Sequence, residues 1–263
     1  MTTYLAQGSP DTNLNHEQLR NALERVFEKL GPRKSVLAVP PDFTRLDSRA
    51  GFITRAVHEH YGDRLKDVLP ALGTHAPMSG EQLQEMYAGI PEHLIRVHNW
   101  RSDVVRVGNL SAEIVGEITH GAYAQPWPAE LNRLVCEGGH DLIFSIGQVV
   151  PHEVAGMANH AKNLFIGTGG PGSINQSHFV GAVCGMEKAM GRDDTPVRRL
   201  LDLALVRFAE KLPIVFILTV VGRASDGEPS DPSGLVTRGL YVGTGTDCFA
   251  LAAKLSRELN VQE

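Results

Sequence analysis

The strongest constraint on the fold is that short apolar runs alternate with helix-like segments along the chain. Four apolar runs have the length of buried strands, namely residues 35–40, 67–73, 141–150 and 213–221. The first helix-like segment opens with a capping-box pattern, in which Gln18 stands three residues after Asn15. Because strands that alternate with helices form parallel sheets, the sequence predicts an α/β fold with a mostly parallel, Rossmann-like sheet flanked by helices.

The remaining elements fit one domain that covers residues 1–263. Helices are predicted at residues 15–30, 51–62, 80–89, 128–138, 177–191, 195–212 and 246–260. Ser79 and Thr195 are the predicted N-caps of two of these helices. The middle of the chain carries β-branched residues with partial alternation, which predicts three strands at residues 94–100, 103–110 and 112–119.

Composition argues against several classes of protein. The net charge of −5 over 263 residues disfavours a nucleic-acid partner. The first residues have neither the basic nor the apolar segment of a signal peptide, and no apolar run approaches the ~20 residues that span a bilayer. The three cysteines are widely spaced and form no CxxC motif, so neither a disulfide framework nor a cysteine-rich zinc site is expected. We therefore expect a cytoplasmic protein with no membrane partner.

Three polar loops each follow a predicted strand, at residues 42–45, 73–75 and 151–178. In open α/β sheets, ligands bind at the carboxyl ends of the strands. The order of the chain therefore brings these three loops toward one crevice.

The first two loops contain residues suited to anion binding and proton transfer. Asp42 and Arg45 flank Thr44 in the run PPDFTR. A guanidinium binds a carboxylate or phosphate through two hydrogen bonds, but an Asp42–Arg45 pair that only stiffens the loop is the alternative. His75 follows a strand and a glycine in GTHAP. It is either an ordinary loop residue or a general acid or base, because histidine titrates near neutrality.

The third loop combines histidines, glycines and one lysine in a segment that is otherwise small or apolar. His152, Lys162 and His178 are too widely spaced for a helical HxxxH metal pair. Lys162 is open to several interpretations: a phosphate clamp, a neighbour of a metal, a covalent attachment point or a lysine whose amine reaches solvent. His160, between them, is expected to be structural.

The glycines of the same loop, in GTGGPG at residues 167–172, form a second candidate feature. Glycines let the backbone approach a ligand closely, so backbone N–H groups here could cradle a phosphate. The run matches neither a Walker A loop nor a G-x-G-x-x-G fingerprint.

Taken together, five motifs in this order resemble the nickel-pincer lactate racemase family, in its N-terminal catalytic domain. They are DFTR at 42–45, GTHAP at 73–77, PHEVAG at 151–156, Lys162 within AKNLFIG, and His178 within NQSHF. The resemblance implies a racemase or epimerase of a 2-hydroxy acid, lactate-like or larger, that works by proton-coupled hydride transfer. It also implies the cofactor of the family, the nickel-pincer nucleotide (nickel pyridinium-3,5-bisthiocarboxylic acid mononucleotide).

The resemblance implies a role for each matching residue. Lys162 would hold the cofactor through a thioamide bond, and His178 would be the protein ligand to nickel. His75 and His152 would stand on opposite sides of the substrate carbon as proton-transfer groups. The substrate carboxylate would bind Arg45. Asp42 would help to bind and orient the substrate or contact the cofactor. The cofactor would also be contacted by Thr44, Gly167, Gly169 and Gly170.

Two departures from the family pattern are visible. Lactate racemase itself carries Gly-Gly-Arg-Lys at the attachment lysine, where this chain has Asn159, His160, Ala161 and Lys162. Members also continue into a C-terminal domain, which we expect to be absent from this chain. Oligomeric state cannot be inferred from the sequence.

Two other functions remain open at the level of sequence. One is a zinc-dependent hydrolase or lyase that uses His75, His152 and His178, since three histidines make a familiar zinc set. The other is a non-catalytic domain that binds a 2-hydroxy acid. Zinc without an organic adduct would favour the first, and binding without exchange of the α-hydrogen would favour the second.

Overall fold

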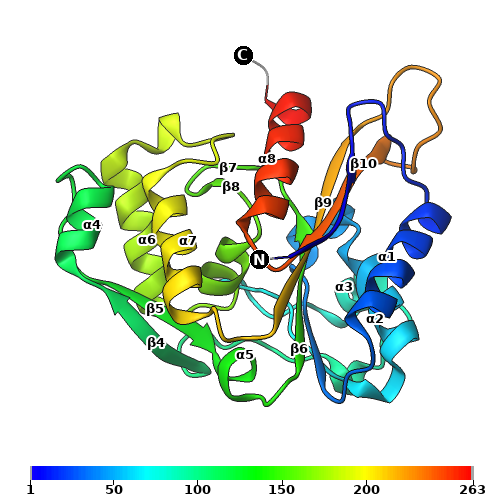
Figure 1. Ribbon diagram of the computed structural model, residues 1–263, viewed down its shortest axis with the longest axis horizontal. Helices are drawn as coiled ribbons and strands as arrows, with labels where there is room; N and C mark the ends of the chain where they lie inside the picture. Colours follow the sequence, from blue (N-terminus) through cyan, green and yellow to red (C-terminus); the bar gives the residue numbers. More distant parts are fainter. Residues whose placement is uncertain (1, 262–263) are drawn as a thin grey trace.

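A six-stranded sheet forms the central layer of the computed structural model, which describes residues 2–261 (Figure 1). Its strands are β1 (Thr3–Gly8), β2 (Val36–Val39), β3 (Leu65–Val68), β6 (Leu142–Gln148), β9 (Ile214–Arg223) and β10 (Leu235–Gly243). They lie in the order β1-β10-β9-β6-β2-β3. Neighbours from β3 to β9 run parallel, whereas β10 and β1 add an antiparallel edge. The predicted α/β fold with a mostly parallel sheet is therefore confirmed.

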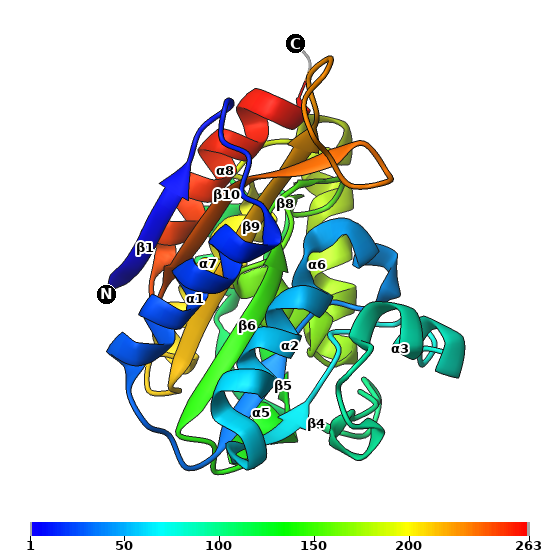
Figure 2. The same cartoon turned by 90° about the vertical axis from the view of Figure 1, so that its right-hand side faces the viewer.

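Helices cover both faces of this sheet (Figure 2). They are α1 (His16–Leu30), α2 (Ala50–Tyr61), α3 (Gly80–Tyr87), α4 (Ala112–Ile118), α5 (Arg133–Glu137), α6 (Pro171–Cys184), α7 (Pro196–Phe208) and α8 (Thr246–Asn260). α1 and α2 contribute to one apolar cluster, and α6, α7 and α8 contribute to the other. The sheet thus separates two buried cores.

The alternation of side chains along the strands explains why the apolar runs are unbroken. In β2, Val36 and Ala38 pack with α1 and α2, whereas Leu37 and Val39 pack into the opposite core. Successive side chains of a strand point to opposite faces, so a strand covered on both faces must be apolar throughout. The same arrangement brings the carboxyl ends of β2, β3 and β6 to one edge of the sheet.

The predicted helix caps are confirmed. The Asn15 side chain accepts a hydrogen bond from the Gln18 N–H at 2.9 Å, and the Gln18 side chain accepts one from the Asn15 N–H. Ser79 caps α3 in the same way, and Thr195 accepts the backbone N–H of Arg198 at the start of α7. These side chains satisfy N–H groups that a helix end leaves without partners.

Two elements in the middle of the chain were predicted with the wrong type. Residues 112–119 form α4 rather than a strand, because Ser111 caps a helix on which Ile114, Val115 and Ile118 lie on one face. Residues 128–138 are only partly helical, since β5 (Trp127–Asn132) precedes α5. β5 pairs antiparallel with β4 (Val104–Leu110), and this pairing overrides local propensity.

Other boundaries also differ from the predictions. No strand was predicted for β1 or β10, and residues 94–100 form no named strand. β3 ends at Val68, so the predicted strand at 67–73 starts too late and continues too far. α6 begins at Pro171 rather than at residue 177, because proline suits the first turn of a helix. No helix within residues 2–261 is long and apolar enough to cross a bilayer.

Candidate functional site

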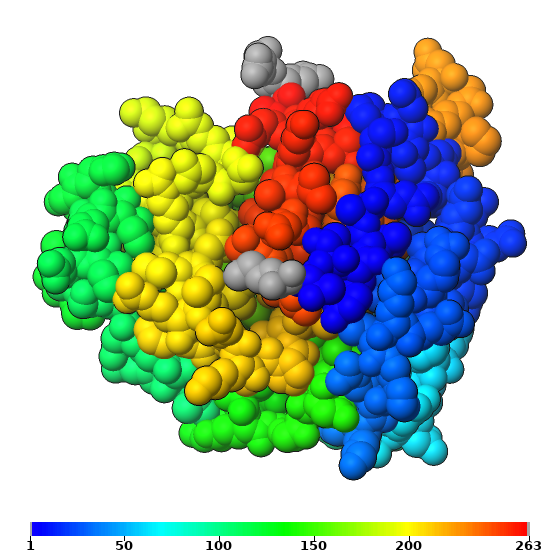
Figure 3. All heavy atoms as spheres, viewed as in Figure 1, coloured from blue at the N-terminus to red at the C-terminus, as the bar shows by residue number. Residues whose placement is uncertain are grey.

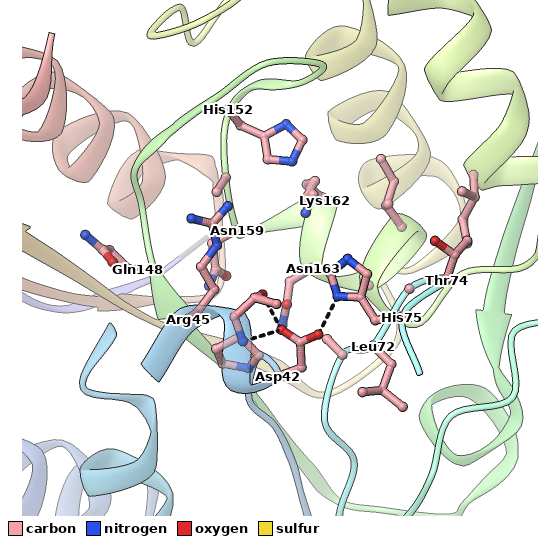
Figure 4. Close-up of a pocket in the computed structure, with 18 of the residues that line it drawn as sticks. Asp42, Arg45, Leu72, Thr74, His75, Gln148, His152, Asn159, Lys162 and Asn163 are labelled. Carbon is pink, nitrogen blue, oxygen red and sulfur yellow. Dashed lines mark hydrogen bonds and ion pairs between the residues drawn. The ribbon is translucent and has the colours of Figure 1, made fainter. Parts of the chain in front are cut away.

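A cavity of about 390 Å³ opens at the edge where β2, β3 and β6 end (Figure 4). Its lining includes most of the residues singled out in the sequence, namely Asp42, Thr44, Arg45, His75, His152, Lys162, Gly167 and His178. The crevice predicted from chain order therefore exists. Gly169 and Gly170 are not part of its lining.

Asp42 orients His75. The Asp42 carboxylate is nearly buried, with 7% of its side chain exposed, and its Oδ2 lies 2.5 Å from His75 Nδ1. Its Oδ1 accepts the backbone N–H and the hydroxyl of Thr44. Because an ionised carboxylate can only accept, the hydrogen of His75 is assigned to Nδ1. Its Nε2 is then a bare acceptor on a ring that is 57% exposed, as a general base requires.

Arg45 has no carboxylate partner within residues 2–261. It lies on a 3-10 helix, Phe43–Ser48, where its backbone departs from helical geometry (φ −120°, ψ 37°). Asp42 pairs with His75 rather than with Arg45, so the interpretation of an Asp42–Arg45 stiffening pair does not hold. The Arg45 guanidinium lines the cavity and is available to an anionic ligand.

His152 has the opposite hydrogen-bonding polarity from His75. Its Nδ1 accepts the backbone N–H groups of Val154 at 3.1 Å and Ala155 at 3.3 Å. Burial, together with the positive charges of Lys162 and Arg45, lowers the pKa of His152 to about 3. The ring is therefore neutral near pH 7 and carries its hydrogen on Nε2, which makes it a donor.

Lys162 extends into the cavity from the turn that precedes a short π-helix, Asn163–Gly167. Burial, together with the positive charge of Arg45, lowers the pKa of its amine to about 8. Roughly a tenth of the amine is therefore uncharged at pH 7, and this fraction is able to act as a nucleophile. Figure 4 shows the rings of His75 and His152 on either side of Lys162.

His178 lies on the exposed side of α6, at the margin of the cavity. Its Nδ1 donates to the carbonyl of Ile174 at 2.8 Å, which leaves Nε2 free as a ligand. Within residues 2–261, no group of three His, Cys, Asp or Glu side chains is arranged to hold a metal. The three histidines of the zinc alternative are thus not gathered into one ligand set, and His178 offers a single protein ligand.

The glycines of GTGGPG are divided between two environments. Gly167 lines the cavity, and its carbonyl accepts the Gly73 N–H at 2.8 Å. Gly169 and Gly170 lie against other parts of the protein, next to Phe165 and Glu130 respectively. The backbone N–H groups at the start of α6 already have an acceptor, because Gly172 and Ser173 both donate to the Glu130 carboxylate. The predicted phosphate cradle gains no support from this geometry.

Several polar residues of the cavity were not singled out in the sequence, namely Thr74, Gln148, Asn159 and Asn163. The Asn163 side chain donates to the Val39 carbonyl and to Ser145 Oγ, and so ties β2 to β6 beneath Lys162. Gln148 is the last residue of β6, and its position at the carboxyl end of a strand was the one available signal.

These features define an α/β protein with a polar cavity at one edge of a parallel sheet, lined by an oriented histidine, a guanidinium and a lysine of lowered pKa. The chain belongs to the lactate racemase N-terminal domain family, whose family model matches residues 4–191. No protein of curated function matches the chain.

Two solved structures are similar in fold. A crystal structure of a Thermotoga maritima protein superposes with a TM-score of 0.78 and 27% identity, over 97% of this chain and 60% of that one. The lactate racemase apoprotein from Thermoanaerobacterium thermosaccharolyticum gives a TM-score of 0.64 and 17% identity, over 86% of this chain and 50% of that one. The chain therefore matches 60% of the length of the first protein and half the length of the second.

Proposed function

We propose that this domain catalyses racemisation or epimerisation of a 2-hydroxy acid, lactate or a larger one, with a nickel-pincer nucleotide as its cofactor. The observation that carries the proposal is the opposite polarity of two histidines beside Lys162. His75 offers a bare Nε2 that accepts a proton, and His152 offers an Nε2–H that donates. Inversion at a carbon that bears a hydroxyl group requires a proton to leave and return, which a paired acceptor and donor suit.

Arg45 is the proposed partner of the substrate carboxylate, because its guanidinium lines the cavity without an internal carboxylate partner in residues 2–261. With the substrate bound there, His75 Nε2 takes the hydroxyl proton. Asp42 then stabilises the resulting imidazolium through the bond at Nδ1. The family match supports this assignment, since it covers the segments that carry both residues.

His152 would hydrogen-bond the substrate from the other side of the cavity through its Nε2–H. For the opposite enantiomer, the two histidines exchange roles. That exchange requires His152 to give up a tautomer that the N–H groups of Val154 and Ala155 stabilise. The proposal therefore includes an asymmetry between the two directions of the reaction.

The residues around the cavity fit the proposed cofactor. When bound, the cofactor would supply a hydride acceptor for the substrate carbon. Lys162 would hold it as a thioamide, and conversion of the amine to an amide removes the cost of burying a charge. His178 would provide one imidazole through its free Nε2, and imidazole together with sulfur suits Ni(II).

The test is to produce the chain in cells that make the cofactor and to measure intact mass and nickel content. We expect a covalent adduct of the cofactor's mass on Lys162, together with interconversion of the enantiomers of a 2-hydroxy acid. Lys162→Ala should lose the adduct, whereas Lys254→Ala, at an exposed lysine, should retain it. An unmodified chain from cells that load a known lactate racemase would rule out the covalent role of Lys162.

A further inference from the structure

The turn that leads into Lys162 holds two successive non-glycine residues in the left-handed region. Asn159 has φ 65° and His160 has φ 57°. For an L-residue with a side chain this region is less favourable than the right-handed helical region. Glycine adopts such angles freely, but both of these residues carry side chains. Other contacts must therefore hold the backbone of this chain in that shape.

Arg198 of α7 supplies the first of these contacts. Its side chain is buried, with 1% exposed, and its Nη2 donates to the carbonyl of Met157. Nη1 and Nη2 both reach the carbonyl of Asn159 at 3.4 Å. The same carbonyl accepts the backbone N–H of Lys162 at 3.3 Å. The guanidinium thus binds the acceptor that closes the turn around Lys162.

The ring of His160 supplies the second contact. It is fully buried, with its centroid 4.0 Å from that of Phe216 and 5.1 Å from that of Phe249. Its Nε2 lies 3.3 Å from the carbonyl of Gly245, and its Nδ1 lies 3.5 Å from Asp202 Oδ1. The ring therefore fixes the turn to β9, α7 and α8 together.

Arg198 and His160 belong to one assembly. The guanidinium of Arg198 stacks over the ring of Phe249, 4.4 Å from its centroid, and its Nη1 lies 3.6 Å from Asp202. α7 and α8 form part of the outer surface on the face seen in Figure 3, so this assembly is held between surface helices and the cavity.

We propose that Arg198 and His160 are positioning residues that clamp the turn at 159–162 and thereby fix the Lys162 amine in the cavity. Contacts from α7 and α8 thus enforce backbone angles that these two residues would not adopt readily by themselves. The inference rests on the proposed function only in that the Lys162 amine would serve there as the cofactor attachment point. The placement and titration of that amine can be measured without cofactor or substrate.

The experiment measures reductive methylation of lysines by formaldehyde and cyanoborohydride across a pH series, with peptide mass analysis. Lys254 is exposed and serves as the internal reference in each digest. In the wild-type chain, labelling of Lys162 should reach half its maximum near pH 8, where its amine loses the proton. Loosening of the turn admits water and raises that midpoint. A rise of one unit lowers labelling at pH 8 about fivefold.

The informative variants are His160→Gly and Arg198→Lys. His160→Gly removes the imidazole ring but permits the left-handed backbone angle at this position. Arg198→Lys keeps the positive charge but loses the two guanidinium nitrogens that donate to the turn. Both should raise the Lys162 midpoint and reduce its labelling at pH 8 about fivefold or more, relative to Lys254.

His120→Gly is the matched control, because His120 is also a left-handed histidine (φ 53°) but is exposed. It should leave Lys162 labelling unchanged. The proposal is overturned if the folded Arg198→Lys chain keeps the wild-type midpoint, or if His120→Gly shifts it equally. If His160→Gly fails to fold, the Lys162 midpoint of Arg198→Lys alone tests the proposal. Loss of cofactor binding in the wild type would instead count against the proposed function and leave the clamp intact.

Discussion

His75 Nδ1 lies 2.5 Å from Asp42 Oδ2, and this pairing leaves Arg45 without an internal carboxylate partner among residues 2–261. The Asp42 carboxylate thus sets the tautomer of His75 and forms no ion pair with the guanidinium of Arg45. The pairing separates the proposed proton transfer by His75 from the proposed anion binding by Arg45, so each can be tested by itself.

Asp42→Asn should reduce kcat by about 10²–10⁴, because an amide does not stabilise an imidazolium and can favour the wrong tautomer. KM should change little, since Arg45 remains available. Steady-state kinetics in both directions would measure this, with Asp47→Asn, at an exposed aspartate of the same 3-10 helix, as the control. A kcat within twofold of wild type would contradict the assigned role of Asp42.

Arg45→Lys should weaken binding of a 2-hydroxy acid about tenfold, because a single ammonium cannot replace two parallel hydrogen bonds to a carboxylate. Calorimetric titration of the chain with lactate and with larger 2-hydroxy acids gives the affinity directly. Arg101→Lys, at an exposed arginine outside the cavity, is the comparison. Equal affinities for wild type and Arg45→Lys would mean that the carboxylate binds elsewhere.

His152 should make the fold sensitive to acid. Its pKa is about 3 in the folded chain against the usual 6.5, so the unfolded chain binds this proton first as pH falls. The contribution to stability is complete above pH 6.5 and declines between 6.5 and 3, by up to about 1.4 kcal/mol per pH unit. Urea unfolding near pH 7 and about pH 4.5 should show a smaller loss for His152→Gln than for wild type. Parallel losses would show that other groups cause the acid sensitivity.

His178→Ala should lower the nickel content of the loaded protein while the adduct on Lys162 remains. The reason is that the His178 imidazole is the one protein ligand proposed for nickel, whereas covalent attachment of the cofactor depends on the Lys162 amine. Metal analysis beside intact mass separates the two, and His93→Ala, at an exposed histidine away from the cavity, is the control. Nickel retained at the wild-type ratio would remove His178 from the ligand set.

The crevice could be predicted from the sequence because it depends on strand order, which a parallel α/β pattern largely determines. Asp42, His75 and His152 each follow such a strand, and the cavity includes all three. The hydrogen-bond polarity of the two histidines could not be predicted, since it depends on individual contacts such as those of Val154 with His152.

The predictions that were wrong concern elements whose secondary structure depends on tertiary contacts. β1 and β10 gain their pairing only at the edge of the completed sheet, and β5 is a strand because β4 lies beside it. Arg198 gave no local signal, because an arginine on an amphipathic helix ordinarily lies on the solvated face. Its burial beneath the turn at 159–162 becomes visible only when α7 is packed in place.

The hydrogen bond from the Gly73 N–H to the Gly167 carbonyl has a mechanical consequence. It joins the loop that carries His75 to the π-helix that follows Lys162. A change in the distance between these two segments would therefore strain this bond.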